Sequence, residues 1–106
     1  MLKRGDKIKI RFRRAFDNQM FHFIVGEVVD FNNEWIKILG RNYYSTQPQL
    51  PPKVTEHKQL SMIPREVIRN IDILPRNLNL DKIKYTYKDG AMRITTPEQE
   101  SLYKEF

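Results

Sequence analysis

The sequence predicts an all-β fold built as one small bent barrel, and three patterns lead to this prediction. Apolar and charged residues alternate strictly from Lys7 to Arg13, which is the period of a half-buried strand. Segments 23–39 and 63–73 are rich in β-branched and aromatic residues, as strands are. Asp89 and Gly90 separate two further strand-like runs, which indicates a hairpin with a two-residue turn.

Length and composition limit the kind of protein. A chain of 106 residues with 40% apolar and 30% charged residues suits one domain with a thin core. It contains no cysteine, which excludes disulfides and thiolate metal sites. No apolar run approaches the roughly 20 residues of a membrane span, and no apolar segment near Met1 suggests a signal peptide. We therefore expect a soluble cytoplasmic protein that does not contact membranes.

The net charge of +6 favours anionic partners, nucleic acid first. Basic residues crowd the first strand, where one parity holds Ile8, Ile10 and Phe12. The opposite parity holds four candidate RNA-binding residues: Lys7, Lys9, Arg11 and Arg13. Such a basic stripe can follow a nucleic-acid backbone, and a solvated strand face is the alternative interpretation.

The first strand, 7–13, is followed by a second at 20–31 and a third at 35–39. Gly26 interrupts a β-branched run, which predicts a bulge or a sharp bend. A tight turn is expected at 32–34, and Gly40 is expected to end or kink the third strand. A tryptophan at a strand start, here Trp35, is more often a core residue; a stacking platform is the alternative.

After a proline-containing loop at 41–52, a fourth strand is possible at 53–63 and a last barrel strand at 67–74. Ile63, Val67 and Ile71 also fit helical spacing, with Pro64 suited to a first helical turn. We prefer strands there because the segment is rich in β-branched residues.

Residues 75–106 are expected to form an extension to a barrel of residues 1–74. A linker at 75–80 leads to a hairpin at 82–95. Thr96, Pro97 and Glu98 then resemble a helix start, which predicts a short helix over 97–104. The extension is expected to pack on the barrel or on a neighbouring subunit.

No group of residues suggests catalysis. His22 and His57 lie far apart without ligand spacing, and the chain has neither a glycine-rich phosphate loop nor a nucleophile elbow. We therefore expect a protein that is not an enzyme, with no catalytic residues, no metal site and no cofactor.

Segment 3–74 resembles the Sm-like (LSm) family in two spaced motifs. The first has a glycine, an apolar residue, an aromatic residue and an acid, then methionine and asparagine, and the matching positions here are Gly26, Val28, Phe31, Asn32, Trp35 and Ile36. The second has apolar residues at offsets zero, five and eight around an arginine-glycine pair, and here these positions fall at Ile63, Ile68 and Ile71. Arg65 stands one place late, Ile36 replaces the asparagine, and the second motif has no glycine.

The resemblance implies a strongly bent five-stranded antiparallel Sm-like barrel whose edge strands pair between subunits. Such pairing satisfies exposed edge groups and closes a homo-oligomeric ring, here of five to seven subunits. The family binds RNA at the loop after the second strand and at the loop between the last two. The residues so implicated are Asn32, Asn33, Trp35 and Arg65. The alternative is a Src-homology-3-like barrel that acts as a protein-interaction or assembly module without nucleic-acid binding.

Overall fold

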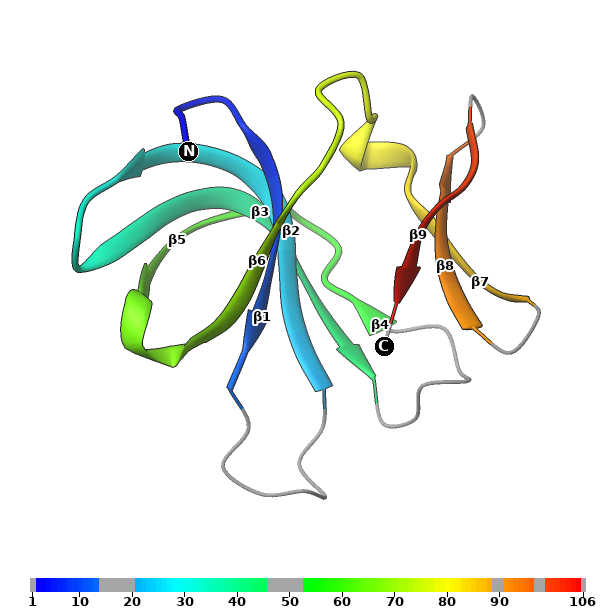
Figure 1. The fold of residues 1–106 in the computed structure, drawn as a ribbon, viewed down its shortest axis with the longest axis horizontal. Coiled ribbons are helices and arrows are strands. Elements are labelled where there is room, and N and C mark those ends of the chain that lie inside the picture. Colours follow the sequence, from blue (N-terminus) through cyan, green and yellow to red (C-terminus); the bar gives the residue numbers. More distant parts are fainter. Residues whose placement is uncertain (1, 14–20, 46–52, 89–90, 97–98, 106) are drawn as a thin grey trace.

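The computed structural model describes residues 2–13, 21–45, 53–88, 91–96 and 99–105, and within them the fold is a strongly curved antiparallel sheet with a smaller sheet beside it (Figure 1). The all-β class is confirmed. The larger sheet contains β1 (Lys7–Phe12), β2 (Phe21–Phe31), β3 (Trp35–Ser45), β4 (Lys53–Val54), β5 (Gln59–Pro64) and β6 (Ile68–Ile73). Its strand order is β4-β3-β2-β1-β6, and β5 pairs with β3 as well.

Strand β3 is longer than predicted, and it carries two partners on one edge. Its first half pairs with β5, from Trp35 opposite Pro64 to Gly40 opposite Gln59. Its second half pairs with the two residues of β4. The expected single strand over 53–63 is therefore two strands, and Gly40 lies within β3 rather than at its end. The irregularity predicted at Gly26 falls instead between Val28 and Asp30.

The sheet bends around a core made almost entirely of isoleucine and valine from the inner faces of its strands. Its buried members are Ile8, Ile10, Ile24, Val28, Ile36, Ile38, Ile63 and Ile68. Burying one such side chain stabilises the fold by roughly 1.5–3 kcal/mol. Within the described residues β5 pairs with β3 alone and β6 with β1 alone, so the sheet does not close.

One 3-10 turn, η1 (Arg65–Val67), joins β5 to β6. Pro64 precedes it with extended angles, φ −61° and ψ 136°, which a proline adopts readily. The helical spacing noted around Val67 therefore produces a single turn, and strand structure resumes at Ile68.

A second apolar cluster covers the outer face of β1–β3, and residues 74–83, here called the strap, provide half of it. Leu74 and Leu78 are buried and pack with Phe23, Val25 and Tyr43, and Leu80 and Ile83 pack against this group. Figure 1 shows the strap rising from β6 and crossing toward η2 (Leu80–Lys82). The linker expected at 75–80 has no strand or helix over residues 75–79, and its leucines in addition pack on a sheet face.

The extension continues as β7 (Lys84–Lys88), β8 (Ala91–Thr96) and β9 (Gln99–Glu105) in one antiparallel sheet. Lys88 pairs with Ala91, which confirms the predicted hairpin; its turn residues 89–90 lie outside the described residues. The predicted helix over 97–104 is wrong, since β9 pairs with β8 from Gln99 onward. A helix of two turns is marginal by itself, whereas the edge of β8 offers hydrogen bonds to every second residue.

Candidate nucleic-acid interface

The turn between β2 and β3 lies against the start of η1, and the two enclose an open groove. Trp35 and Pro64 are partners in the β3–β5 ladder, so the residues beside them are brought together from positions about 30 apart in the chain. The groove has a volume of about 540 Å³. Its lining, here called the loop groove, consists of Asn33, Glu34, Trp35, Met62, Pro64, Arg65 and Glu66. Three of the four residues expected at the family's RNA site, Asn33, Trp35 and Arg65, thus line one surface.

Asn32, the fourth, shapes the turn and does not line the groove. Its side-chain oxygen Oδ1 accepts hydrogen bonds from the backbone N–H of Glu34 at 2.8 Å and of Trp35 at 2.9 Å. Asparagine commonly holds a turn in this way. Because Oδ1 already accepts two bonds, Asn33 is better suited than Asn32 to contact a base.

Arg65 ties the two halves of the groove together. Its backbone N–H donates to the carbonyl oxygen of Glu34 at 2.9 Å, and its Nε donates to the carbonyl oxygen of Asn32 at 2.7 Å. Within the described part of the chain, the terminal guanidinium nitrogens make no further hydrogen bond. The side chain therefore positions the β2–β3 turn and still offers donors to an anion.

Lys37 does not line the groove, but it lies beside Trp35, and the sequence interpretation missed it. Its Nζ lies 5.6 Å from the centroid of the Trp35 ring, within the range of a cation–π interaction. The two residues are two apart on one strand and so share a face, a signal that the alternation rule would have revealed. A cation beside a partly exposed indole is a pairing that suits a stacked base with its phosphate.

Glu34 and Glu66 also line the groove. Both residues are exposed. Among the described residues, neither carboxylate takes part in an ion pair or a side-chain hydrogen bond. By contrast, Asp30 on neighbouring β2 accepts from Phe31 N–H at 2.9 Å and from Arg4 Nη2 at 3.1 Å, which lowers the pKa of its carboxyl. The two glutamates are therefore the acceptors available to a ligand.

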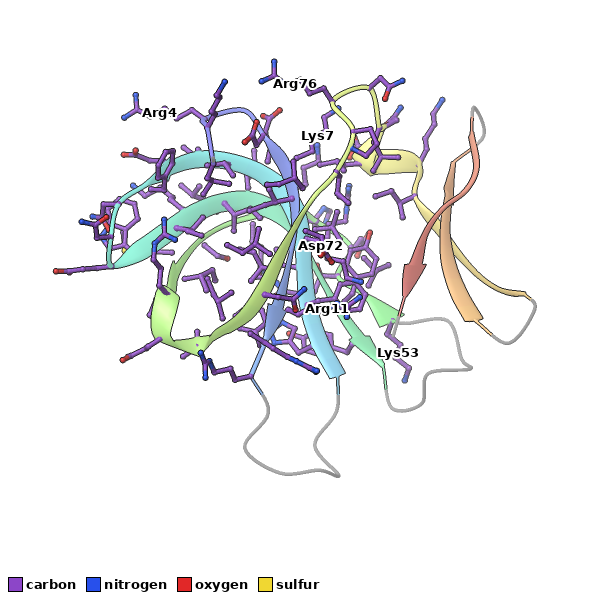
Figure 2. The ribbon with its side chains drawn as sticks, in the orientation of Figure 1. Arg4, Lys7, Arg11, Lys53, Asp72 and Arg76 are labelled. Atoms are coloured by element: carbon purple, nitrogen blue, oxygen red, sulfur yellow. The ribbon has the colours of Figure 1, made fainter. Side chains whose placement is uncertain are left out.

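The basic residues of segment 7–13, in β1 and directly after it, do not line the groove. Lys7 Nζ donates to the carbonyl oxygen of Leu78 in the strap at 2.6 Å, and Arg13 Nε donates to that of Ile68 at 3.2 Å. Arg11 Nε lies 4.0 Å from a carboxylate oxygen of Asp72. Figure 2 shows Lys7 toward the strap and Arg11 near Asp72, at opposite ends of the strand. Each of these three cations thus contacts another part of the fold, the strap, Ile68 or Asp72, and none of them lines the loop groove.

Lys9 is only 2% exposed. Its side chain therefore neither faces solvent nor is accessible to RNA, which were the two interpretations of the basic stripe. Its Nζ lies 4.5 Å from the centroid of the Phe23 ring, and it makes further contacts besides this one. Burial lowers the pKa of Lys9 to about 7; the charge of Arg11 adds to this effect and that of Asp72 opposes it. Its role is inside the fold.

A second hollow of about 340 Å³ lies between the strap and the sheet, and its cations are already engaged. Besides Lys7, its lining includes Lys58, whose Nζ lies 3.1 Å from Asp81. Asp81 also receives Arg41 Nη1 at 2.8 Å. Ion pairs between the strap and the sheet therefore occupy the charged groups of this hollow, and the loop groove is the better candidate site.

Within the described residues, no three histidine, aspartate or glutamate side chains gather in a way that could hold a metal ion. None of the helices described is long and apolar enough to cross a membrane. Comparisons of the chain with protein-family models, with curated proteins and with solved structures gave no match. Any functional conclusion must therefore come from the loop groove and the open sheet edges.

Proposed function

We propose that this protein is an Sm-like RNA-binding module that takes single-stranded RNA into the loop groove. The observation that carries the proposal is the convergence of Trp35, Arg65 and Asn33 on one open surface. An aromatic side chain next to cations binds single strands through base stacking and phosphate contacts, each stacked base being worth about 1–3 kcal/mol. Unpaired bases suit such a site because a duplex hides their faces. The cytoplasm is the compartment that we propose for this activity.

We also propose that the module joins copies of itself into a homo-oligomeric ring of five to seven subunits. The open edges of β5 and β6 support this, because unpaired edge strands invite pairing with another chain. Two side chains on the exposed face of β5, Leu60 at 61% and Met62 at 54%, would lose solvent contact in such a pairing. A head-to-tail contact repeated by rotation closes a ring.

RNA binding is tested by fluorescence anisotropy with a labelled single-stranded pentanucleotide at several salt concentrations. We expect Trp35→Leu to weaken binding at least about tenfold and Trp35→Phe to retain most of it, since phenylalanine still stacks. Lys37→Gln should reduce both affinity and the salt slope. The matched control is Lys53→Gln, which removes the same charge from β4, beside the other half of β3. An RNA affinity that changes neither with salt concentration nor on substitution of Trp35 would refute the proposal.

The ring is tested by native mass spectrometry of the wild type and of Leu60→Glu/Met62→Glu. We expect a closed oligomer for the wild type and a folded monomer for the double variant, because both side chains are exposed on the isolated chain. Val54→Glu is the control, since Val54 is 50% exposed on β4, away from β5. A wild type that is monomeric at micromolar concentration would contradict self-association.

The second candidate is a Src-homology-3-like module that binds a protein partner and no RNA. Leu39 and Leu60, which are partners across β3 and β5, are 39% and 61% exposed and leave an apolar surface. Such a surface beside a groove with Trp35 and Pro64 would suit a peptide. Binding of a protein partner together with no measurable RNA affinity would favour this function.

A further inference from the structure

We infer that the loop groove selects guanine, and that the carboxylates of Glu34 and Glu66 are the specificity-determining groups. The inference rests on the proposed RNA-binding function and names the base that this site would accept. It follows from the hydrogen-bonding character of the groove wall beside Trp35.

The lining of the loop groove includes two exposed acidic residues together with Trp35. Glu34 directly precedes Trp35 at the β2–β3 turn, and Glu66 lies in η1, directly after Arg65. Both carboxylates lie outside every ion pair among the described residues, and both are exposed to a ligand. An ionised carboxylate only accepts hydrogen bonds, and its two oxygens accept from two adjacent donors at once.

Guanine is the base whose edge matches this chemistry. Its N1–H and N2–H donors stand side by side and pair with the two oxygens of one carboxylate. Adenine and cytosine each offer one amino group next to a ring acceptor. Uracil offers a single N–H flanked by two carbonyl oxygens, which a carboxylate repels. The expected order is guanine first, adenine and cytosine next, and uracil last.

Two cations, Arg65 in the groove lining and Lys37 beside Trp35, set the orientation of the RNA strand. Lys37 lies by the Trp35 ring, and Arg65 is anchored to Asn32 through Nε. Phosphates are attracted to these two groups and repelled by the glutamates, so the base edge rather than the backbone faces Glu34 and Glu66. The site thus separates backbone contact from base contact.

The test uses five labelled uridine pentanucleotides that differ at the central position, which is guanine, inosine, adenine, cytosine or uracil. A single guanine per strand prevents guanine quadruplexes. We expect guanine to bind about tenfold more tightly than inosine, which lacks the N2 amino group, because one bond to a charged acceptor is lost. Uracil should bind more weakly than all the others.

The variants Glu34→Gln and Glu66→Gln keep the side-chain shape and remove the charge. We expect at least one of them to reduce the guanine-over-inosine ratio below about threefold, with overall affinity unchanged or higher, since a repulsive charge is gone. The control is Glu56→Gln, which changes an exposed glutamate outside the groove.

The outcomes separate the inference from the function on which it rests. RNA binding that depends on Trp35 but shows equal affinity for guanine and uracil would overturn the inference and leave the function standing. So would a guanine preference that survives both glutamate variants. If no pentanucleotide binds, the proposed function fails and the inference fails with it.

Discussion

Gly26 of β2 and Gly40 of β3 are direct partners across the sheet, and their backbones approach too closely for any side chain. A Cβ atom on Gly26 would lie 2.5 Å from the carbonyl oxygen of Leu39 and 2.7 Å from the Cα atom of Gly40. A Cβ on Gly40 would meet Val25 and Gly26 in the same way. The obstructing atoms belong to the backbone, so they cannot rotate away. The two glycines permit the close approach of the two long strands.

Gly26→Ala is therefore expected to destabilise the fold by about 1–3 kcal/mol or more, because an extra methyl group must displace backbone in a packed interior. Urea unfolding followed by circular dichroism measures the loss. Glu27→Ala, at the next and exposed position of the same strand, is the control and should cost less than about 0.5 kcal/mol. Equal stability of Gly26→Ala and the wild type would contradict the close approach.

Leu78 should matter to stability as much as a barrel core residue does. It is 1% exposed in the strap, so Leu78→Ala is expected to cost about 2–4 kcal/mol from lost burial and the cavity left behind. The same substitution at Leu60, which is 61% exposed, should change the unfolding free energy by less than about 0.5 kcal/mol. If both variants behave alike in urea titrations, the strap does not seal the outer face.

The buried amine of Lys9 makes stability depend on pH. Its pKa falls from 10.5 in the unfolded chain to about 7 in the fold, mainly because of burial. Between these values the unfolded chain holds a proton that the folded chain has released, so stability rises with pH from about 7 toward 10.5. Over that pH range the unfolding free energy would rise by on the order of 4–5 kcal/mol in all, because each unit of pKa shift corresponds to 1.36 kcal/mol.

The measurement is a set of urea titrations between pH 6 and pH 9.5. Within that range Tyr43 keeps its proton, since burial raises its pKa above the usual 10. Lys9→Met keeps the length of the side chain and removes the ionisable group. We expect it to be more stable than the wild type at pH 7 and to lose most of the pH-dependent rise. A rise that persists in this variant would assign it to another group.

Asp81 holds the strap to the barrel through Arg41 and Lys58. Its side chain is 54% exposed, so Asp81→Asn should lower global stability by no more than about 1 kcal/mol. The clearer effect is expected in hydrogen exchange, as faster exchange of the amides of 77–83. Glu27→Gln, which borders the same hollow, is the control. Unchanged exchange in Asp81→Asn would show that leucine packing alone holds the strap.

The same contact should weaken in acid. The hydrogen bond from Arg41, and then that from Lys58, lowers the pKa of Asp81 below its ordinary 3.8. The stabilisation of the strap by the Asp81 carboxylate is therefore present above pH 3.8. It is lost as the pH falls through the lower pKa that Asp81 has in the folded protein. Exchange at 77–83 should accelerate over that interval in the wild type and not in Asp81→Asn.

The sequence by itself determined which residues of the first strand face the interior of the curved sheet. Alternation along the chain identified Ile8 and Ile10 as core residues, because a strand repeats every two residues regardless of what covers it. It also identified the turn at Asn32 and the hairpin of β7 and β8. Over 97–104 the sequence resembles a helix start, yet from Gln99 onward the chain pairs with the edge of β8 as a strand.

The tertiary structure alone decided what lies on the other face and where the site forms. Lys9 has the pattern of a solvated residue, yet it is buried in a region covered by a strap that begins 65 residues later. Trp35 and Arg65 meet because β3 pairs with β5, a register that no local pattern encodes. Periodicity records how a segment presents its side chains, whereas the neighbour that each face meets depends on the path of the whole chain.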